Sequence, residues 1–557
     1  MKRPISLILL FYFLGIFLYE NYIFSKFSIL LIFILISIFF IFSNFSYKSI
    51  VILFLSLGLL FTSIREEKII ENSFSKKTIS IYEIDNSKNI SYGKILEDNR
   101  KVIIYDDLEL GYNYNVLGKY ENIISNDNFS FSYENFLKTK DIYNGFKIIK
   151  IYERNKSSNF FINLKISFNN LIESSTEDLE DSSKEIVKSI ILSKGENETF
   201  NNMRYVGLSH LIAISGLHIN LIYNLFFSIG KIFKIKREIL VFISISILLL
   251  YAYFIGFRPS VLRAIFMLII MEISLVSKNI YDPINALYLS TLIILIINPF
   301  NIYDSGLLLS FFASFIIYGI YPFISYIFPS DRKYFKDLYF LLILQIFLLP
   351  IELYLFGKFN FINIIGNILI SPIFNLLVNF ILLTLIFGSF MYLPISIVVE
   401  GLINILNFLL KILSKVDFLN INLYLTKNQV VLIYFFLLFF IYIKKYSFKR
   451  KLIKRYLNIL LLFLPIFLIY FYPKGELIML DVGQGDAFII RKGNINICFD
   501  TGGSLSKSRG EKLVSDIKSL GIRDIDLLIL SHDDYDHIGY LDIFIENFLI
   551  KEIFTSY

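Results

Sequence analysis

About thirteen apolar runs of roughly 20 residues determine what this chain can fold into, because a helix of that length spans the hydrocarbon core of a bilayer. Hydrophobic residues make up 55% of the sequence, and the mean hydropathy is +0.63. This composition excludes a soluble globular protein. The single cysteine, Cys498, excludes an intramolecular disulfide framework and a CxxC metal site. We therefore expect a polytopic α-helical membrane protein.

The first 64 residues are expected to cross the membrane three times. A Lys-Arg pair after the first Met precedes apolar runs at residues 5–18, 28–42 and 50–62. Cytoplasmic flanks of membrane spans carry an excess of Lys and Arg, which places the N-terminus inside. Three spans then deliver the next segment to the outside.

Residues 65–153 form the first soluble segment and are expected to be a small all-β unit. Short runs with alternating apolar residues, separated by Asn, Asp and Gly, occur at residues 78–82, 101–105 and 116–120. In the linker that follows, residues 154–206, apolar residues recur at helical spacing between 156 and 171. This spacing predicts an amphipathic helix on the membrane surface.

The stretch from Gly207 to Ile219 is polar for an apolar part of the chain, and reads Gly-Leu-Ser-His-Leu-Ile-Ala-Ile-Ser-Gly-Leu-His-Ile. It carries Ser215 and two of the four histidines, His210 and His218. This separation is about 2.2 helical turns, so both imidazoles would lie within roughly 80° on one helix face. An ionisable side chain in a membrane segment usually faces the bundle interior or a wet cavity. A histidine pair that only packs two helices together is the alternative.

Residues 207–473 form the main membrane domain, and its basic loops indicate its orientation. Basic residues gather at residues 231–237, 278, 332–336 and 444–455. If all four loops are cytoplasmic, the spans alternate consistently provided that one apolar piece does not cross. We place that piece at residues 361–371, where Asn, Gly and Ser interrupt the apolar run and predict irregular backbone. The last span, at about residues 456–472, then leads to the outside.

The composition changes again at residue 474, and residues 474–557 are expected to form a soluble α/β segment. Strands are predicted at residues 477–480, 487–490, 495–499 and 525–530. The last of these runs into Ser-His-Asp-Asp-Tyr-Asp-His, residues 531–537. Two histidines and three carboxylates at the end of a buried strand are typical of a metal site, and this mixture suits zinc or manganese.

Residues 207–218 resemble the characteristic motif of the ComEC family, the membrane proteins of DNA uptake in bacterial natural transformation. Segments that begin at Arg258, Arg263 and Asp304 agree with ComEC-type segments in order and spacing. The resemblance implies an OB-like β unit, a competence-type membrane domain and a path for single-stranded DNA. Candidate residues of this path are His210, Ser215, His218, Arg258, Arg263 and Asp304.

Each of these features also has a purely structural interpretation. Arg258 would then extend its guanidinium to the membrane interface, and Arg263 would form a buried ion pair with Glu272. OB-folds bind single strands through basic grooves and aromatic platforms, but the β unit would equally serve a structural role.

His532-x-Asp534-x-Asp536-His537 resembles the metal-binding motif of the metallo-β-lactamase superfamily, with Asp534 at a position where many members have histidine. By position, His532 and Asp534 would hold one metal, and Asp536 and His537 a second. That superfamily fold requires a second half with further histidines, and no histidine follows His537. We expect that the chain is truncated or that a separate polypeptide completes the site. An active nuclease from this chain alone is not expected.

The resemblance implies an inner-membrane channel that translocates single-stranded DNA into the cytoplasm, with the soluble domains outside. It implies single-stranded DNA, membrane lipid, a DNA receptor and an ATP-driven translocase as partners, and it admits a homo-oligomer. Two rival functions are a membrane-anchored extracellular metal-dependent hydrolase and a transporter of small anions. A mere anchor has no need for His210, His218 or Arg258 within or beside its spans.

Overall fold

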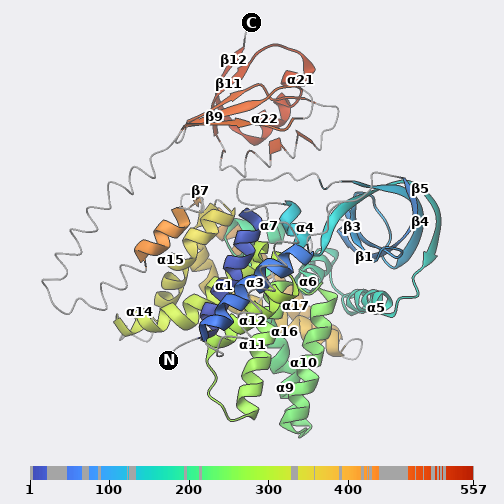
Figure 1. Cartoon of the computed structure of the whole chain (residues 1–557), viewed down its shortest axis with the longest axis vertical. Coiled ribbons are helices and arrows are strands. Elements are labelled where there is room, and N and C mark those ends of the chain that lie inside the picture. Colours follow the sequence, from blue (N-terminus) through green and yellow to red (C-terminus); the bar gives the residue numbers. More distant parts are fainter. Residues whose placement is uncertain are drawn as a thin grey trace, which may run out of the picture.

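Figure 1 shows a helical bundle, a β-barrel beside it, and a C-terminal α/β part drawn in orange to red. The computed structural model describes residues 4–21, 47–65, 74–85, 90–121, 123, 133–193, 197–212, 216–327, 336–356, 358–387, 392–415, 420–422, 425, 429–437, 475–482, 485–492, 495–503, 509–510, 513–514, 517, 522 and 524–555.

The bundle consists of apolar helices. They are α1 (Pro4–Asn21), α3 (Tyr47–Arg65), α8 (Ser209–Ile212), α9 (Gly216–Ile232), α10 (Arg237–Phe254), α11 (Pro259–Val276), α12 (Pro283–Ile297), the 3-10 helix η1 (Pro299–Tyr303), α13 (Ser305–Phe315), the π-helix η2 (Ile316–Ile320), α14 (Tyr321–Ile327), α15 (Lys336–Phe356), α16 (Ile362–Phe387) and α17 (Tyr392–Leu413). A small two-stranded sheet joins β6 (Lys358–Asn360) to β7 (Asn420–Asn422).

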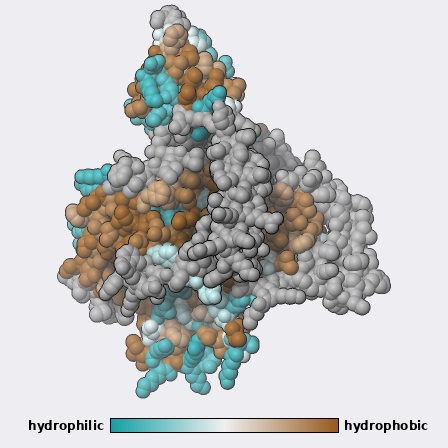
Figure 2. All heavy atoms as spheres, turned by 90° about the vertical axis from the view of Figure 1, so that its left-hand side faces the viewer, coloured by the Kyte–Doolittle hydropathy of each residue, from teal (hydrophilic) through white to brown (hydrophobic). Residues whose placement is uncertain are grey.

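Six helical stretches in the described part of the chain are long and apolar enough to cross a membrane. They are Arg237–Phe254, Pro259–Val276, Ser305–Tyr326, Leu338–Phe356, Ile362–Leu385 and Ile395–Leu413. Three shorter apolar helices, Ile5–Tyr19, Leu53–Arg65 and Pro283–Ile297, accompany them. The expected runs at residues 28–42 and 456–472 lie outside the described residues, so the total of about thirteen spans stays a prediction. Figure 2 shows apolar side chains in a broad zone over the helical part and hydrophilic ones at its lower end.

Helices α1 and α3 approach each other closely because both carry glycine at the contact. A Cβ atom on Gly15 would lie 2.2 Å from the carbonyl oxygen of Leu55, and one on Gly58 would lie 2.5 Å from that of Tyr12. Small residues at helix crossings are the usual way for apolar helices to pack tightly in a membrane. The Tyr12 hydroxyl also donates to the Leu295 carbonyl at 3.1 Å, which attaches this helix pair to α12.

The predicted all-β unit is a closed five-stranded barrel. Its strands are β1 (Ser75–Asp85), β2 (Ile90–Ile95), β3 (Lys101–Ile104), β4 (Tyr112–Glu121) and β5 (Ile142–Lys156), arranged in the order β1-β2-β3-β5-β4. β1 pairs with β4 and closes the barrel, and β3 runs parallel to β5. Alternate side chains such as Ile79, Ile81 and Val116 fill the interior, as the period of two in these runs requires.

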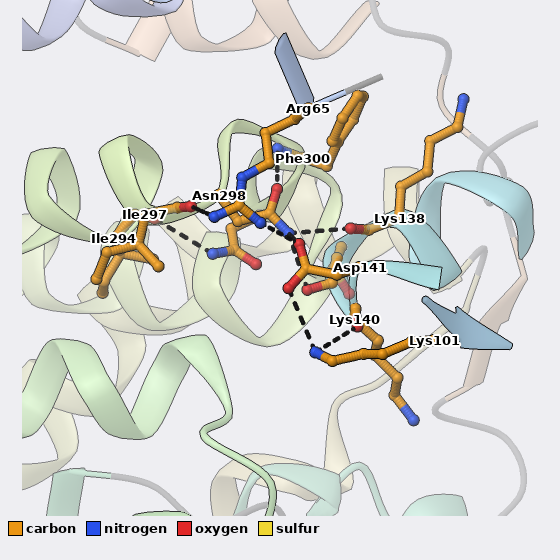
Figure 3. Close-up of polar contacts among 11 residues, drawn as sticks. Arg65, Lys101, Lys138, Lys140, Asp141, Ile294, Ile297, Asn298 and Phe300 are labelled. Atoms are coloured by element: carbon orange, nitrogen blue, oxygen red, sulfur yellow. Dashed lines mark hydrogen bonds and ion pairs between the residues drawn. The ribbon is translucent and has the colours of Figure 1, made fainter. Parts of the chain in front are cut away.

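Asp141 is the centre of the junction between the barrel and the bundle (Figure 3). It lies between α4 (Tyr133–Thr139) and β5 and accepts from Arg65, the last residue of α3. Arg65 also donates to the Ile297 carbonyl of α12 at 2.6 Å. Asn298, only 4% exposed, donates to Asp141 Oδ1 at 3.2 Å and to two carbonyls in the last turn of α4 at 2.9 and 3.1 Å. The barrel is therefore fixed to the ends of α3 and α12.

Three surface helices, α5 (Phe160–Ser175), α6 (Asp181–Leu192) and α7 (Glu198–Tyr205), connect the barrel to the bundle. The helix predicted from residue 156 starts later, because β5 continues to Lys156 and Asn159 then caps α5 through its side chain. Lys165 donates to the Tyr82 carbonyl of the barrel at 3.2 Å, and Tyr253 of α10 donates to the Phe161 carbonyl at 2.8 Å. Helix α5 thus contacts both parts.

The irregular backbone predicted at residues 361–371 is wrong, because α16 is a helix from Ile362 to Phe387 that includes Pro372. The polar residues of this segment do not break the helix. Asn367 Nδ2 donates to the Asn363 carbonyl at 3.0 Å, and Ser371 Oγ donates to Asn367 Oδ1 at 3.3 Å, so their polar groups are bonded along one helix face.

The C-terminal part contains a five-stranded mixed sheet in the order β12-β11-β10-β9-β8. Its elements are β8 (Gly475–Met479), β9 (Phe488–Lys492), β10 (Ile495–Phe499), β11 (Asp524–Leu530), α21 (Tyr535–Ile538), α22 (Leu541–Asn547) and β12 (Leu549–Thr555). β10, β11 and β12 are parallel, whereas β8, β9 and β10 pair antiparallel. The four strands predicted here are confirmed, with ends shifted by at most two residues.

The junction yields a first prediction. Asn298→Ala leaves Asp141 Oδ1 and two carbonyls of α4 without this donor, and loss of a buried donor costs roughly 1–3 kcal/mol. Hydrogen exchange measured by mass spectrometry should therefore become faster between residues 136 and 145 and stay unchanged in β2. Arg154→Ala is the matched control, because it removes an exposed ion pair with Glu109 on the barrel surface. Unchanged exchange in the Asn298→Ala variant would show that the junction does not depend on this side chain.

Candidate functional site

A chain of side-chain hydrogen bonds connects α8, α16 and α15 in the bundle. His210 Nε2 lies 3.0 Å from Asn367 Oδ1. Asn367 Nδ2 donates to Asn363 Oδ1, and Asn363 Nδ2 donates to Gln345 Oε1 at 3.4 Å. Gln345 Nε2 donates in turn to Glu352 Oε2 at 3.0 Å. This polar chain, from His210 to Glu352, links the first histidine of the motif to a carboxylate on α15.

The spacing of these residues places them on facing sides of two helices. Asn363 and Asn367 are four residues apart on α16, and Gln345 and Glu352 are seven apart on α15, which is about two turns. Asn363 is 5% exposed and Gln345 is 9% exposed. A buried amide costs free energy unless it is hydrogen-bonded, so each member of the polar chain stabilises its neighbours.

Arg263 is buried in the bundle and is held by serine hydroxyls. Its Nη2 donates to Ser310 Oγ at 2.6 Å, and its Nη1 donates to Ser314 Oγ at 2.7 Å, both on α13. The ion pair with Glu272 that a structural interpretation suggested is wrong. Glu272, on α11, instead accepts from the Tyr223 hydroxyl at 2.8 Å and from Arg237 Nη2 at 3.0 Å. Arg263 and Glu272 thus connect α11 to different neighbours.

Arg258 and Asp304 both cap helices near the barrel. Arg258 donates from Nη1 to Ser193 Oγ at 2.7 Å and from Nη2 to the Ser193 carbonyl at 2.8 Å, so it holds the residue that ends α6. Asp304 caps α13, as its Oδ1 accepts from the Leu307 amide at 2.6 Å. A Cβ atom on Gly256 would lie 3.7 Å from Glu83 Oε2 of β1, which shows how close this end of α10 lies to the barrel.

His218 lies in an apolar environment, unlike His210. It is 3% exposed on α9, and its ring packs edge-on against Phe374 of α16 at a centroid distance of 5.8 Å. His210 is exposed and contacts the same helix through Asn367. Ser215 lies outside the described residues, so whether the two histidines share one continuous helix stays a prediction.

The histidines of the C-terminal motif lie at the carboxyl edge of the parallel strands. β10 and β11 end side by side, which brings Asp500 next to the motif. Asp500 accepts from the Ser531 amide at 2.7 Å and hydroxyl at 2.6 Å, and its Oδ2 lies 2.9 Å from His537 Nδ1. His532 and His537 have ring centroids 3.9 Å apart. Asp500 therefore fixes the position of the second histidine.

Electrostatics at this cluster follow from the same contacts. The hydrogen bond to Asp500 raises the pKa of His537 above its ordinary value. Burial raises the pKa of Asp500, but hydrogen bonds from Ser531 and His537 outweigh burial, and the pKa of this carboxyl lies below its usual range.

The described residues do not complete a metal site. His532 Nε2 lies 3.3 Å from Asp534 Oδ2, and His537 Nε2 lies 3.8 Å from Asp536 Oδ2, which gives two separate nitrogen–oxygen pairs. No three His, Cys, Asp or Glu side chains among the described residues converge on one point. Zinc requires three or four protein ligands, so no chemical step through a metal follows from this arrangement.

Two glycines allow the loops to reach the motif. A Cβ atom on Gly485, with φ +84°, would lie 1.8 Å from the Asp536 carbonyl oxygen, and one on Gly503 would lie 1.8 Å from that of Tyr535. The Thr501 amide also donates to the His537 carbonyl at 2.8 Å. The described residues of the loops that follow β8 and β10 thus lie against the backbone of the motif, whose side chains stay largely exposed.

Fold and site together define a multi-span membrane protein with a metallo-β-lactamase-like C-terminal part. Residues 193–448 match the family described as "Competence protein", and residues 480–553 match the metallo-beta-lactamase superfamily. The chain belongs to the ComEC/Rec2 competence protein family.

Curated relatives agree with this assignment. ComE operon protein 3 of Bacillus subtilis is 29% identical over 455 residues, which cover 76% of this chain and 57% of that protein. Recombination protein 2 of Haemophilus influenzae is 26% identical over 395 residues, 62% of this chain and 49% of that protein. Uncharacterized protein MG316 of Mycoplasma genitalium is 30% identical over 228 residues, 38% of this chain and 56% of that protein. The chain therefore spans roughly half the length of these relatives. No solved structure matches.

Sequence reasoning missed most of the polar chain. Asn363 and Asn367 were interpreted as helix breakers, and Gln345 and Glu352 were not considered. Their spacings of four and seven residues within apolar runs are the signal that would have identified them. No role was predicted for Asp500, which directly follows the strand at residues 495–499, although the carboxyl ends of parallel strands are where polar sites form.

Arg263 yields a second prediction. In a Ser310→Ala, Ser314→Ala double variant, the guanidinium loses both serine hydroxyls as acceptors, and leaving buried donors unsatisfied costs roughly 1–3 kcal/mol for each group. Further replacement by Arg263→Met should recover much of the loss, because no charge then remains. The measurement is thermal unfolding of the purified full chain in detergent.

The matched control for this comparison is Ser246→Ala, because the Ser246 hydroxyl is exposed and bonds only the Phe242 carbonyl of its own helix. We expect no measurable change for it. If the triple variant is less stable than the double variant, the serines are not the main acceptors of Arg263, and acceptors such as Met267 Sδ, 3.3 Å from its Nη1, contribute more.

Proposed function

We propose that this chain conducts single-stranded DNA across the cytoplasmic membrane during natural transformation. Membership of the competence family supports this role, and the names of two relatives, ComE operon protein 3 and Recombination protein 2, agree with it. The observation that carries the proposal is the polar chain from His210 to Glu352, which lies among apolar spans and begins in the family motif. An anchor for an external enzyme needs no such chain, because apolar helices alone would hold it.

The residues of this path have different roles in the proposal. His210, the exposed member of the polar chain, offers its imidazole to bases and phosphates that pass it, and the amides behind it hold this ring in position. Arg258 uses both ends of its guanidinium on Ser193, so we assign it a positioning role at the end of α6 rather than a direct phosphate contact. Arg263 has its donors on Ser310 and Ser314 and joins α11 to α13. Asp304 positions α13 as its cap.

The barrel is proposed to be OB-like and to contact the incoming strand. Its five strands and closed order support an OB-like assignment. On its surface, Arg154 lies 5.1 Å from the ring centroid of Tyr112, and Lys76 lies 5.0 Å from that of Tyr152. Cations paired with aromatic rings are the side chains that bind single strands through phosphate attraction and base stacking. We therefore propose that this face of β4 and β5 meets DNA before the membrane domain does.

The orientation is proposed to have the N-terminus inside and both soluble parts outside. Helix α10 supports it: its first residue, Arg237, belongs to a basic loop, and its other end contacts α5 and the barrel. Its 18 residues extend about 27 Å, nearly the thickness of the hydrocarbon core. The basic loop and the barrel lie at opposite ends of α10, which supports a location on opposite sides of the membrane. The domain limits proposed are 1–64, 65–153, 154–206, 207–473 and 474–557.

The C-terminal part is proposed to bind zinc or manganese through His532, Asp534, Asp536 and His537 once further ligands are present. The neutral nitrogen and carboxylate donors suit either metal. A DNA receptor, an ATP-driven translocase and a further copy of this chain are proposed as partners. A membrane-anchored extracellular metal-dependent hydrolase stays the rival function, and it would need metal ligands beyond these four residues.

The transport role is tested at the polar chain. We expect Asn367→Leu and Gln345→Leu to abolish most internalisation of labelled DNA in a deletion strain that expresses the full chain, at wild-type protein levels in the membrane. Each change removes two or more hydrogen bonds from the chain and leaves the apolar volume similar. Gln345→Glu retains the oxygen that accepts from Asn363 but loses the donor to Glu352, so it should keep only part of the uptake.

Thr384→Val is the matched control, because the Thr384 hydroxyl lies on the same helix and bonds only the Ile381 carbonyl one turn away. It should import DNA like the wild type. Wild-type uptake in both Asn367→Leu and Gln345→Leu would mean that the polar chain is structural and that DNA passes elsewhere.

The orientation has its own test. The single native cysteine, Cys498, is buried, so an introduced cysteine is the main target of a membrane-impermeant maleimide. We expect Ser447→Cys to react only after lysis and Ser158→Cys, at an exposed position just before α5, to react in intact cells. Labelling of Ser447→Cys in intact cells would reverse the proposed orientation.

A further inference from the structure

A cavity of about 220 Å³ lies between α5, α6, α9, α10 and α16. Its walls are almost entirely apolar and include Ile222, Phe226, Ile247, Phe254, Ile381 and Leu382. Polar atoms come from His218 and from Tyr251, whose hydroxyl already donates to the Ile191 carbonyl at 2.9 Å. The cavity is therefore large, and it offers almost no hydrogen-bonding groups to an occupant.

The cavity opens on the side of the bundle that faces lipid. Leu250 of α10 and Leu171 of α5 both line it and are 43% and 42% exposed, so they form its rim. Helix α10 is one of the six candidate spans, and further exposed apolar side chains lie along it, with Phe242 at 72%. The opening is thus continuous with a surface that the bilayer covers.

The lining excludes polar occupants. A nucleobase would bury several N–H and C=O groups against walls that cannot satisfy them, and each such group costs a few kcal/mol. An ordered water requires two to four polar partners, which the apolar walls do not supply. A hydrocarbon chain has no polar groups to desolvate, and it restores the dispersion contacts that an empty cavity of this size lacks.

We propose that this cavity binds one acyl chain of a membrane phospholipid, which enters from the bilayer between Leu171 and Leu250. The rings of Phe168 and Phe254 are stacked with centroids 4.0 Å apart. This pair joins α5 to α10 beside the bound acyl chain. The acyl chain packs next to His218 and fills the space between α9 and α16. This site is distinct from the polar chain and does not depend on the proposed transport role.

The test uses the purified full chain in mild detergent with a phosphatidylglycerol probe that carries a diazirine at the end of one acyl chain. After irradiation, peptide mass spectrometry should locate the adduct on α9, α10 or α16 at lining residues such as Ile222 and Phe254. Native mass spectrometry should find one phospholipid retained after detergent exchange.

Variants distinguish the cavity from the lipid annulus. Leu250→Trp places an indole at the rim, where a larger side chain is tolerated, and Leu382→Trp fills the interior. Both should reduce cavity adducts to background and remove the retained lipid. Phe242→Trp lies on the exposed face of the same helix, away from the cavity, and should change neither signal.

Three outcomes would overturn the proposal. The first is cavity adducts that persist unchanged in both Leu250→Trp and Leu382→Trp. The second is labelling of the same residues by a single-stranded oligonucleotide with photoreactive bases, which would make the occupant a nucleobase. The third is labelling by a free fatty acid probe with none by the phospholipid, which would exclude a membrane lipid. None of these measurements uses DNA uptake, so failure of the lipid site is distinguishable from failure of the proposed transport role.

Discussion

A polar group inside a membrane bundle must find its hydrogen-bond partner within the protein, and the arrangement of these helices depends on that constraint. Apolar side chains pack against lipid tails about as well as against each other, so they define the relative register of two spans only weakly. Hydrogen bonds are directional, so they define the relative register of two spans better. Arg263 joins α11 to α13, Glu272 joins α11 to α9 and α10, and the polar chain joins α8, α16 and α15. Helices α11, α15 and α16 are thereby each aligned with particular neighbours.

The same requirement explains how the barrel is held. Asn298 lies at the end of α12, where the backbone leaves the apolar zone, and its amide group satisfies carbonyls of α4 as well as Asp141. Arg65 connects this group to α3. Because both helix ends bind the same aspartate, the barrel and the first apolar helices behave as one body at this point. A single-stranded DNA that bound to the barrel would consequently be held at a defined distance from the membrane spans.

The sequence predicted those elements whose periodicity is local. The barrel strands follow from alternation. Asp304 was expected on the DNA path, and its role as the cap of α13 was not predicted, although an aspartate before an apolar run is a usual signal of a helix N-cap. Partners distant in the chain could not be predicted, since Ser310 and Ser314 meet Arg263 only through the packing of α11 on α13. The suggested pair of Arg263 with Glu272 could have been rejected, because nine residues on a helix place two side chains on opposite faces. The reading of Asn363 and Asn367 as breakers ignored that a spacing of four marks one helix face.

The two histidines of the family motif illustrate why a motif alone does not assign roles. Both contact α16, but at positions seven residues apart: His210 at Asn367, within the polar chain, and His218 at Phe374, beside the apolar cavity. Helix α16 therefore has a polar part and an apolar part on the side that meets the motif. A substitution that removes polarity at His210 breaks a hydrogen-bonded chain, whereas one at His218 changes the packing of a cavity wall. Their phenotypes should differ for that reason, even though the two residues lie in the same short motif.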